Sequence, residues 1–299
     1  ELRTHVQEFP PERVATITGV PADQIRAAAR LYATGKPSSL LECVATEQNK
    51  DTLSANRAMA ILIAITGNLD VPGGTVFSVH FGADFTSPEL KMTYLLGDEQ
   101  HAKRIGNKEY PLLSGKEALK YNPFSPTGHS GLVWDAILHG RPYQVRMMYN
   151  HGSNMLRSFA NSHKVRRALQ QLEFFVCADL FMTETAQLAD IVLPAGTWME
   201  RSYVHDNSQA TYNTVQKQEK VATYGEAWSD FKILNELAKR LGFGHYFFEK
   251  EEDIPEWRAK LLGMSWADLK EKGGLISRPM EYRKYENAGF KTASGKVEI

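Results

Sequence analysis

The sequence predicts an α/β fold built on a parallel sheet with helices against it. Over residues 144–196, apolar segments of strand length alternate with segments of helical period, and the links between them are short. The strand candidates QVRMMYN, EFFVCAD and DIVLPAG are almost continuously apolar, as expected of strands covered on both faces. A strand–helix–strand–helix–strand order with short links implies right-handed crossovers and parallel pairing.

Helices are expected on both sides of this region. Before it, residues 21–35 and 51–67 carry apolar side chains at helical spacing, and each segment ends at a glycine. A short apolar strand is expected between them, at residues 37–45. After the sheet region, helices are expected at residues 227–242 and 251–263.

Within the sheet region, helices are expected at residues 130–140, 155–172 and 183–189. Residues 78–130 carry Pro, Gly, Lys and scattered aromatic side chains without a clear period. We interpret them as an irregular, lid-like insertion.

Composition restricts the class of protein. The 299 residues include 35 basic and 35 acidic side chains, so no charge excess favours nucleic acid as a partner. The longest apolar run, residues 58–67, is too short to cross a bilayer, and no direct membrane insertion is expected. Cys43 and Cys177 lie in apolar runs and are expected to be buried free thiols. The chain starts without Met and ends in an apparent strand start, so we expect an internal part of a longer protein.

The first candidate site is the loop that follows the strand QVRMMYN. In an open parallel sheet, ligands bind at the carboxyl ends of the strands. Backbone N–H groups at a helix start can bind an anion there, and Gly152, Ser153 and Asn154 are the candidate contacts. The alternative is an ordinary turn in which Asn154 caps the helix, and the loop considered alone favours it. His151 is interpreted as a bystander.

The next two strand ends also carry polar side chains. Asp179 can accept hydrogen bonds from ribose hydroxyls or from the N–H edge of guanine, or it can cap the short helix that follows. Thr183 has the same two interpretations. After the third strand, Glu200 and Arg201 can form a surface ion pair. Alternatively, Arg201 binds phosphate, because its planar fork matches the phosphate oxygens.

No catalytic constellation is visible in the sequence. The nine histidines show neither H-x-x-H nor H-E-x-x-H spacing. G-x-S-x-G, Walker, G-x-G-x-x-G and C-x-x-C motifs are also missing from the sequence. The sequence therefore indicates binding chemistry, with no nucleophile, acid–base pair or metal ligand set.

One long segment resembles a known family. The segment VCADLFMTETAQLADIVLPAGTWMER, residues 176–201, resembles the hallmark of the molybdopterin oxidoreductase family, also called the dimethyl sulfoxide reductase family. Its members carry a strand ending in Asp, then Thr-x-Thr-Ala, then Ala-Asp-x-x-Leu-Pro, then Trp and Glu. Further segments agree in the same order: ITGVPADQIRAAARLYATGKP, AITGNLDVPGG, MMYNHGSNML, GEAWSDFKILNELAKRLG and SGKVEI. The resemblance covers most of the chain except residues 78–130 and 246–287.

The resemblance implies a fold, a cofactor and a set of contacts. It implies a Rossmann-like α/β domain of a larger multi-domain molybdoenzyme, in which two molybdopterin guanine dinucleotides surround one Mo or W. Residues 1–75 would end the preceding α/β domain, residues 76–242 would bind one dinucleotide, and residues 243–299 would lead to a missing C-terminal β-barrel. The implied cofactor contacts, besides Gly152 and Ser153, are Asn154, Asp179, Thr183, Arg201, Asp230 and Gln48.

The resemblance also implies an enzyme assembled from more than this chain. The family's iron–sulfur cysteines and metal ligand lie upstream, so a [4Fe-4S] cluster and the metal ligand are expected on the missing N-terminal part. We expect no cofactor on this fragment alone and no activity from it. The expected partners are the rest of the catalytic subunit and an iron–sulfur electron-transfer subunit. The run ERSYVHDNSQATYNTVQKQ lacks the family's glycine after Trp-Glu, which suggests a divergent branch, such as polysulfide- or thiosulfate-reductase-like.

Three functions are left open. A two-electron oxidoreductase of prokaryotic anaerobic respiration, acting on a small oxo- or sulfur-containing substrate, fits the resemblance. A non-redox member, hydratase-like or transhydroxylase-like, would use the same cofactor. A non-catalytic α/β domain that serves structure or partner contact would also explain the missing catalytic residues.

Overall fold

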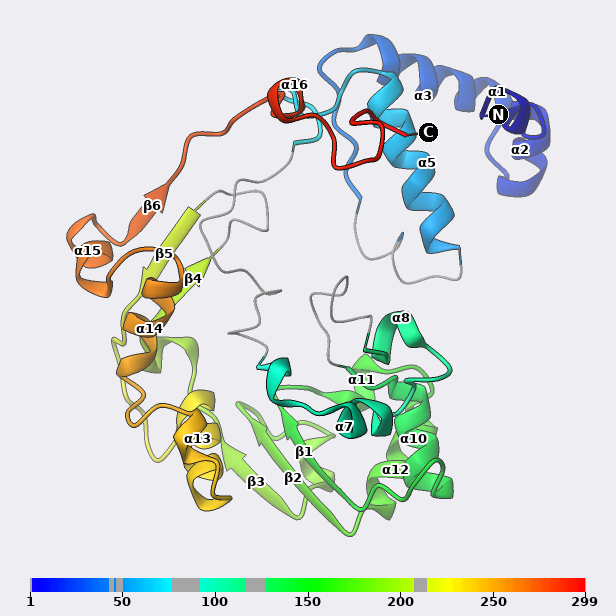
Figure 1. Cartoon of the computed structure of the whole chain (residues 1–299). Coiled ribbons are helices and arrows are strands. Elements are labelled where there is room, and N and C mark those ends of the chain that lie inside the picture. Colours follow the sequence, from blue (N-terminus) through cyan, green and yellow to red (C-terminus); the bar gives the residue numbers. More distant parts are fainter. Residues whose placement is uncertain are drawn as a thin grey trace. The chain divides into compact units, whose positions relative to one another are not determined.

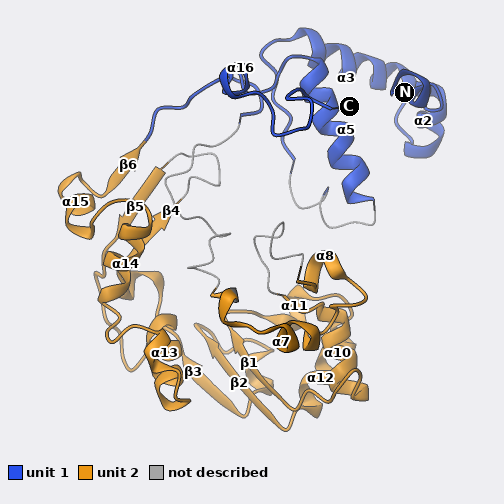
Figure 2. Ribbon diagram, viewed as in Figure 1, with its two compact units in different colours: residues 1–79, 210–213, 278–299 blue, residues 80–209, 214–277 orange. Residues whose placement is uncertain are grey.

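The structure of the chain, a computed structural model, describes residues 2–42, 46, 51–76, 92–116, 127–206 and 214–298 (Figure 1). The chain divides into two compact units (Figure 2). Unit 1 comprises residues 1–79, 210–213 and 278–299, and unit 2 comprises residues 80–209 and 214–277. The segment after residue 242 is therefore divided between the two units.

Unit 2 contains the predicted parallel sheet. Its strands β1 (Met147–His151), β2 (Phe174–Asp179) and β3 (Ile191–Pro194) pair in the order β1-β2-β3, all parallel. Helices α10 (Ser130–His139) and α12 (Ser162–Gln171) contribute Trp134, Ile137, Val165 and Leu169 to the core that surrounds Phe175 of β2. Phe175 is 1% exposed, and burial of such a side chain contributes about 1.5–3 kcal/mol. The predicted α/β fold is confirmed.

The single helix predicted at residues 155–172 is wrong, because the segment forms two helices. α11 (Met155–Ser158) ends before Asn161, which adopts a left-handed conformation with φ of 59°. The Asn161 side chain then accepts a hydrogen bond from Lys164 N and caps α12. Asn tolerates this backbone conformation and is also a strong N-cap, so one residue both ends the first helical segment and starts the second.

Unit 2 also contains an antiparallel sheet that the sequence prediction missed. It pairs β4 (Tyr203–Asp206) with β5 (Thr214–Gln218), and β5 with β6 (Leu275–Ser277). Helices α14 (Asp253–Leu261) and α15 (Trp266–Glu271) supply the rest of its core. Each of these two strands buries a single residue, Val204 in β4 and Val215 in β5. Neither strand therefore shows the repeated alternation of apolar and polar residues by which a strand is recognised in a sequence.

The helices predicted at residues 227–242 and 251–263 are confirmed as α13 and α14. Short helices also occupy the described part of the predicted insertion, whereas residues 77–91 and 117–126 lie outside the described residues. The remaining elements of unit 2 are η1 (Thr93–Leu95), α7 (Asp98–Lys103), α8 (Pro111–Ser114), η2 (Ala186–Leu188), η3 (Trp198–Glu200), α13 (Asp230–Arg240) and η5 (Gly244–Tyr246).

Unit 1 is helical in its described residues, and it confirms both helices predicted in this part of the chain. Its helices are α1 (Leu2–Val6), α2 (Pro11–Thr18), α3 (Ala22–Thr34), α5 (Thr52–Ile65) and α16 (Tyr285–Ala288). The strand predicted at residues 37–45 is not formed over residues 37–42, and Cys43 lies outside the described residues. No helix in the described part of the chain is long and apolar enough to cross a membrane.

Two buried polar side chains in the turn after α5 hold distant segments of unit 1 together by hydrogen bonds. Asn68 is 1% exposed, and its Oδ1 accepts from Ser38 N at 3.2 Å. Asp70 is fully buried and accepts from both Lys284 N and Lys284 Nζ, at 2.9 and 2.8 Å. These bonds tie the turn after α5 to the segment that follows α3 and to the segment around Lys284.

Candidate functional site

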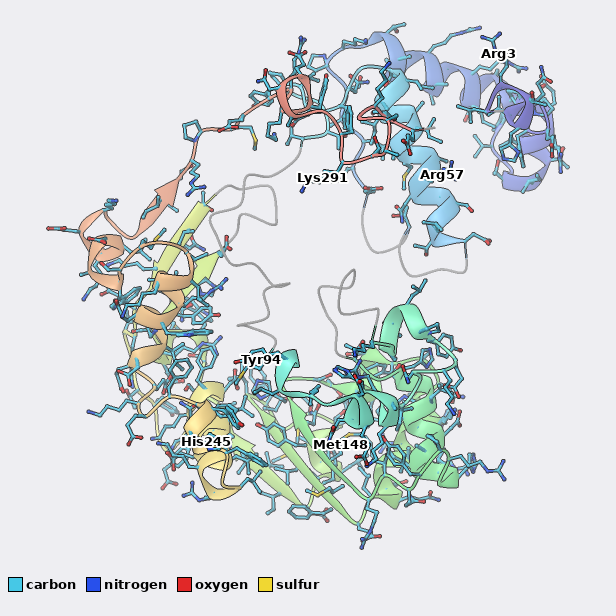
Figure 3. The ribbon with its side chains drawn as sticks, in the orientation of Figure 1. Arg3, Arg57, Tyr94, Met148, His245 and Lys291 are labelled. Carbon is cyan, nitrogen blue, oxygen red and sulfur yellow. The ribbon has the colours of Figure 1, made fainter. Side chains whose placement is uncertain are left out.

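The carboxyl ends of the three parallel strands meet at one edge of the sheet. His151 pairs with Ala178, and Asp179 pairs with Pro194. Gly152 N continues the ladder by donating to Ala178 O at 2.9 Å. The loop after β1 therefore lies beside Asp179 at the end of β2, as the sequence predicts. Met148 marks β1 in the side-chain view (Figure 3).

The loop after β1 presents unpaired backbone donors. Gly152 has φ of 56°, a conformation that favours glycine, and no heavy atom lies within 4 Å of the position of an added Cβ. The buried side chain of Asn150, on β1, stabilises the loop, since its Nδ2 donates to Ser153 O at 2.8 Å. The N–H groups of Ser153, Asn154 and Met155 have no hydrogen-bond acceptor among the described residues.

Asn154 joins the first two strand ends. Its side chain does not cap α11; instead Nδ2 donates to Glu184 Oε2 at 3.0 Å, and Oδ1 accepts from Thr185 Oγ1 at 2.8 Å. Thr185 is fully buried, and its Oγ1 also accepts from Leu156 N at 3.1 Å. Arg157 Nε donates to Glu184 Oε1 at 3.0 Å. We call Asn154, Arg157, Glu184 and Thr185 the loop clamp.

Electrostatics support this clamp. Hydrogen bonds from Arg157 and Asn154 lower the pKa of the Glu184 carboxyl from 4.5 to about 2. Glu184 is therefore ionised throughout the neutral range, and it accepts charge-assisted hydrogen bonds from both partners. The capping role considered for Asn154 is wrong, because both ends of its amide bind the loop after β2.

Asp179 and Thr183 shape the second strand end. Asp179 Oδ1 accepts from Phe181 N at 3.2 Å, which closes a turn, while Asp179 Oδ2 has no partner among the described residues. The alternative that Asp179 caps the following helix is therefore wrong. Thr183 Oγ1 accepts from Ala186 N at 3.2 Å, as a residue at a helix start does. Its hydroxyl proton remains available as a donor.

The third strand end brings Arg201 to Asp230, the first residue of α13. Arg201 NH1 donates to Asp230 Oδ2 at 3.2 Å, and the guanidinium lies 5.1 Å from the centroid of the Phe231 ring. Arg201 Nε is buried and has no acceptor among the described residues. The surface ion pair considered between Glu200 and Arg201 is wrong. Glu200 instead accepts from the backbone N–H groups of Thr197 and Tyr224, each at 2.8 Å, which lowers its pKa.

His151 joins this group, although the sequence prediction treats it as a bystander. Its Nε2 lies 3.6 Å from Asp230 Oδ1, and its Nδ1 lies 3.3 Å from Tyr149 Oη. Asp230 is thus shared between Arg201 and His151. Gln48 lies outside the described residues, and its proximity to a pterin stays a prediction.

Two further residues of the hallmark segment pack within unit 2. Asp190 Oδ2 accepts from Phe175 N at 2.7 Å, so this carboxylate fixes the start of β3 beside β2. Cys177 is buried and free, as predicted, and burial raises the pKa of its thiol. The described residues contain no group of three His, Cys, Asp or Glu side chains that could hold a metal ion.

The strand order and these strand-end residues define an open α/β fold with polar groups at the edge of the sheet where such folds bind ligands. The chain belongs to the molybdopterin oxidoreductase family, whose model matches residues 45–240. The family resemblance and the expectation of a larger molybdoenzyme fold are confirmed.

Several relatives are enzymes of known activity. The chain is 32% identical to acetylene hydratase of Syntrophotalea acetylenica over all of its length and 43% of that protein. It is 30% identical to formate dehydrogenase H of Escherichia coli, over 86% of the chain and 35% of that protein. A solved structure of acetylene hydratase from Pelobacter acetylenicus superimposes on 99% of this chain, with a TM-score of 0.82 and 31% sequence identity. The match covers 43% of the acetylene hydratase chain. The chain thus spans less than half the length of these relatives.

Proposed function

We propose that the loop after β1 and Asp179 together bind one molybdopterin guanine dinucleotide in an intact molybdenum or tungsten enzyme. The observation that carries the proposal is a set of three N–H groups, at Ser153, Asn154 and Met155, that have no acceptor among the described residues. They lie at the strand end next to Asp179, whose Oδ2 also has no partner in the described part of the chain. Phosphate accepts hydrogen bonds from such amides, and guanine offers donors to a carboxylate.

The residues at these strand ends fit both ends of such a ligand. Gly152 leaves open space where a side chain would stand, so a phosphate can approach the backbone. Arg201 Nε is a buried donor without an acceptor among the described residues, and leaving such a donor unpaired costs about 1–3 kcal/mol. A phosphate oxygen would remove that penalty. Asp179 Oδ2 would accept from the guanine N–H edge, and the Thr183 hydroxyl would donate to a ribose oxygen.

The chain's part in the reaction is binding and orientation. When bound, the cofactor supplies a metal centre for two-electron or Lewis-acid chemistry. The loop clamp holds Asn154 and the β2 loop at fixed positions, and Arg201 and Asp230 fix the third strand end. The metal ligand and a [4Fe-4S] cluster would come from the rest of the catalytic subunit, and electrons from an iron–sulfur subunit.

We favour oxidoreduction of a small substrate as the activity of the intact enzyme, because formate dehydrogenases and a nitrate reductase are among the relatives. Hydration is the second candidate, favoured by 32% identity to acetylene hydratase over the whole chain. Formate- or nitrate-dependent turnover of a redox dye by the full-length protein would support the first. Acetaldehyde formation from acetylene without net electron transfer would support the second. A metal-free protein without either activity would favour a non-catalytic domain.

The binding proposal is tested in the full-length enzyme with Asp179→Ala. Acid hydrolysis of the purified protein releases GMP from bound dinucleotide, and the ratio of GMP to protein counts the sites. We expect Asp179→Ala to lower this ratio. The matched control is Glu173→Gln, which removes a carboxylate next to the amino end of the same strand, where Glu173 forms an exposed pair with Arg146. Equal GMP content in Asp179→Ala and wild type would contradict the assignment.

A further inference from the structure

His151 belongs to a cluster of ionisable side chains at the strand ends. Asp230 lies between His151 and Arg201, with Oδ1 3.6 Å from His151 Nε2 and Oδ2 3.2 Å from Arg201 NH1. The three side chains are 38%, 29% and 22% exposed for His151, Asp230 and Arg201. A ligand at the strand ends can therefore reach them from solvent.

The charge of the cluster depends on His151. With neutral imidazole, the Asp230 carboxylate neutralises the Arg201 guanidinium, and the cluster has no net charge. A proton on His151 gives the cluster a net positive charge. Imidazole is the side-chain group that most readily gains or loses a proton near neutral pH.

Other ionisable groups lie near this cluster. Burial raises the pKa of both Tyr149 on β1 and Cys177 on β2, which favours their neutral forms. The charged side chains at these strand ends are Asp179 on β2, Asp230 on α13 and Arg201.

We propose that His151 is a positioning residue that, when protonated, shares Asp230 and leaves Arg201 free to bind the diphosphate group of the ligand. The inference rests on the proposed function, because it assigns the anion to the dinucleotide. Arg201 supports the inference, since one guanidinium N–H donates to Asp230 while the buried Nε–H has no acceptor in the part of the chain that the structure describes. His151 thus competes with Arg201 for the carboxylate and adds attraction for the anion.

The proposal fixes the sign of a pH dependence. A bound anion stabilises imidazolium, so protonation of His151 and binding of the anion favour each other. Affinity is therefore highest at the acid end of the range, where the imidazole carries its proton, and falls as pH rises. A tenfold change in affinity corresponds to a coupling of about 1.4 kcal/mol.

The test measures pyrophosphate binding to cofactor-free full-length protein by calorimetry from pH 5.5 to 8.5. Pyrophosphate titrates in this range itself, so each variant is compared with wild type at every pH. Relative to His151→Gln, wild type should bind about tenfold more tightly at the acid end and equally at the alkaline end. His151→Lys carries a fixed positive charge and should keep the acid-end affinity across the range. His163→Gln, on α12, is the matched control and should follow wild type.

The outcomes separate this inference from the proposed function. If His151→Gln and wild type show the same pH profile, the role of His151 is refuted, provided the Gly152 amide keeps its wild-type exchange protection. The proposed function of dinucleotide binding would still stand in that case if GDP binds wild type and binds Asp179→Ala more weakly. If neither GDP nor pyrophosphate binds wild type, both proposals fail.

Discussion

Thr185→Val tests the loop clamp with almost no change in side-chain volume. The hydroxyl of Thr185 donates to Asn154 Oδ1 at 2.8 Å and accepts from Leu156 N at 3.1 Å. Valine leaves both partners without their bond, and Thr185 is fully buried, so water does not replace it. An unsatisfied buried N–H costs about 1–3 kcal/mol, which corresponds to a roughly 5- to 150-fold change in an opening equilibrium.

Hydrogen–deuterium exchange of the full-length protein measures this opening directly. The amide of Leu156 should exchange roughly 5- to 150-fold faster in Thr185→Val than in wild type. Amides of β2 should change little, because their partners lie in β1 and β3. Thr185→Ser keeps the hydroxyl and should restore most of the protection. Wild-type exchange of Leu156 in Thr185→Val would refute the clamp.

Three further variants test other parts of the structure. The pKa of the Glu184 carboxyl is lowered from 4.5 to about 2. The stability that this carboxylate adds to the loop clamp is therefore complete above pH 4.5 and is lost as pH falls from 4.5 to about 2. The difference in loop protection between wild type and Glu184→Gln, measured by hydrogen exchange corrected for intrinsic rates, should therefore shrink below pH 4.5; a difference that persists at pH 2 would contradict this. Asp70→Asn breaks a pair that is buried on the Asp70 side, while Lys284 is 26% exposed, so we expect a loss of about 3 kcal/mol and trypsin cleavage around Lys284 that is roughly 150-fold faster. The exposed pair broken in Glu286→Gln should give no such increase, and equal cleavage of both variants would count against the role of Asp70. Gly152→Ala should cost about 1–2 kcal/mol through its positive φ, and should lower GMP content while β2 keeps its exchange protection; unchanged GMP content would argue against close approach of a phosphate.

The parallel sheet could be predicted because its strands are short, apolar and separated by recognisable helices. The same reasoning placed Gly152 and Asp179 at neighbouring strand ends, and the pairing of His151 with Ala178 confirms it. Strands β4 and β5 escaped prediction because each buries a single Val between polar residues. Their pairing with β6 also depends on contacts between segments far apart in the chain.

The partners of the site residues could not be read from the sequence. Asn154 and Thr185 are 31 residues apart, and no local pattern states that a hydroxyl after β2 binds an amide after β1. The spacing of His151, Arg201 and Asp230 likewise carries no periodic signal. The buried Thr in Thr-Glu-Thr-Ala was a usable hint, because a short polar run between two strands needs a structural partner. The prediction assigned Thr183 and overlooked Glu184 and Thr185.

An experimental density map of the cofactor-loaded full-length enzyme tests the central claim most directly. We predict one guanine dinucleotide at the carboxyl ends of β1 and β2, with its diphosphate within hydrogen-bond distance of the amides of Ser153 and Asn154. Its guanine N–H groups should lie within hydrogen-bond distance of the Asp179 carboxylate. A loaded enzyme whose dinucleotides both lie away from Asp179 and this loop would contradict the account.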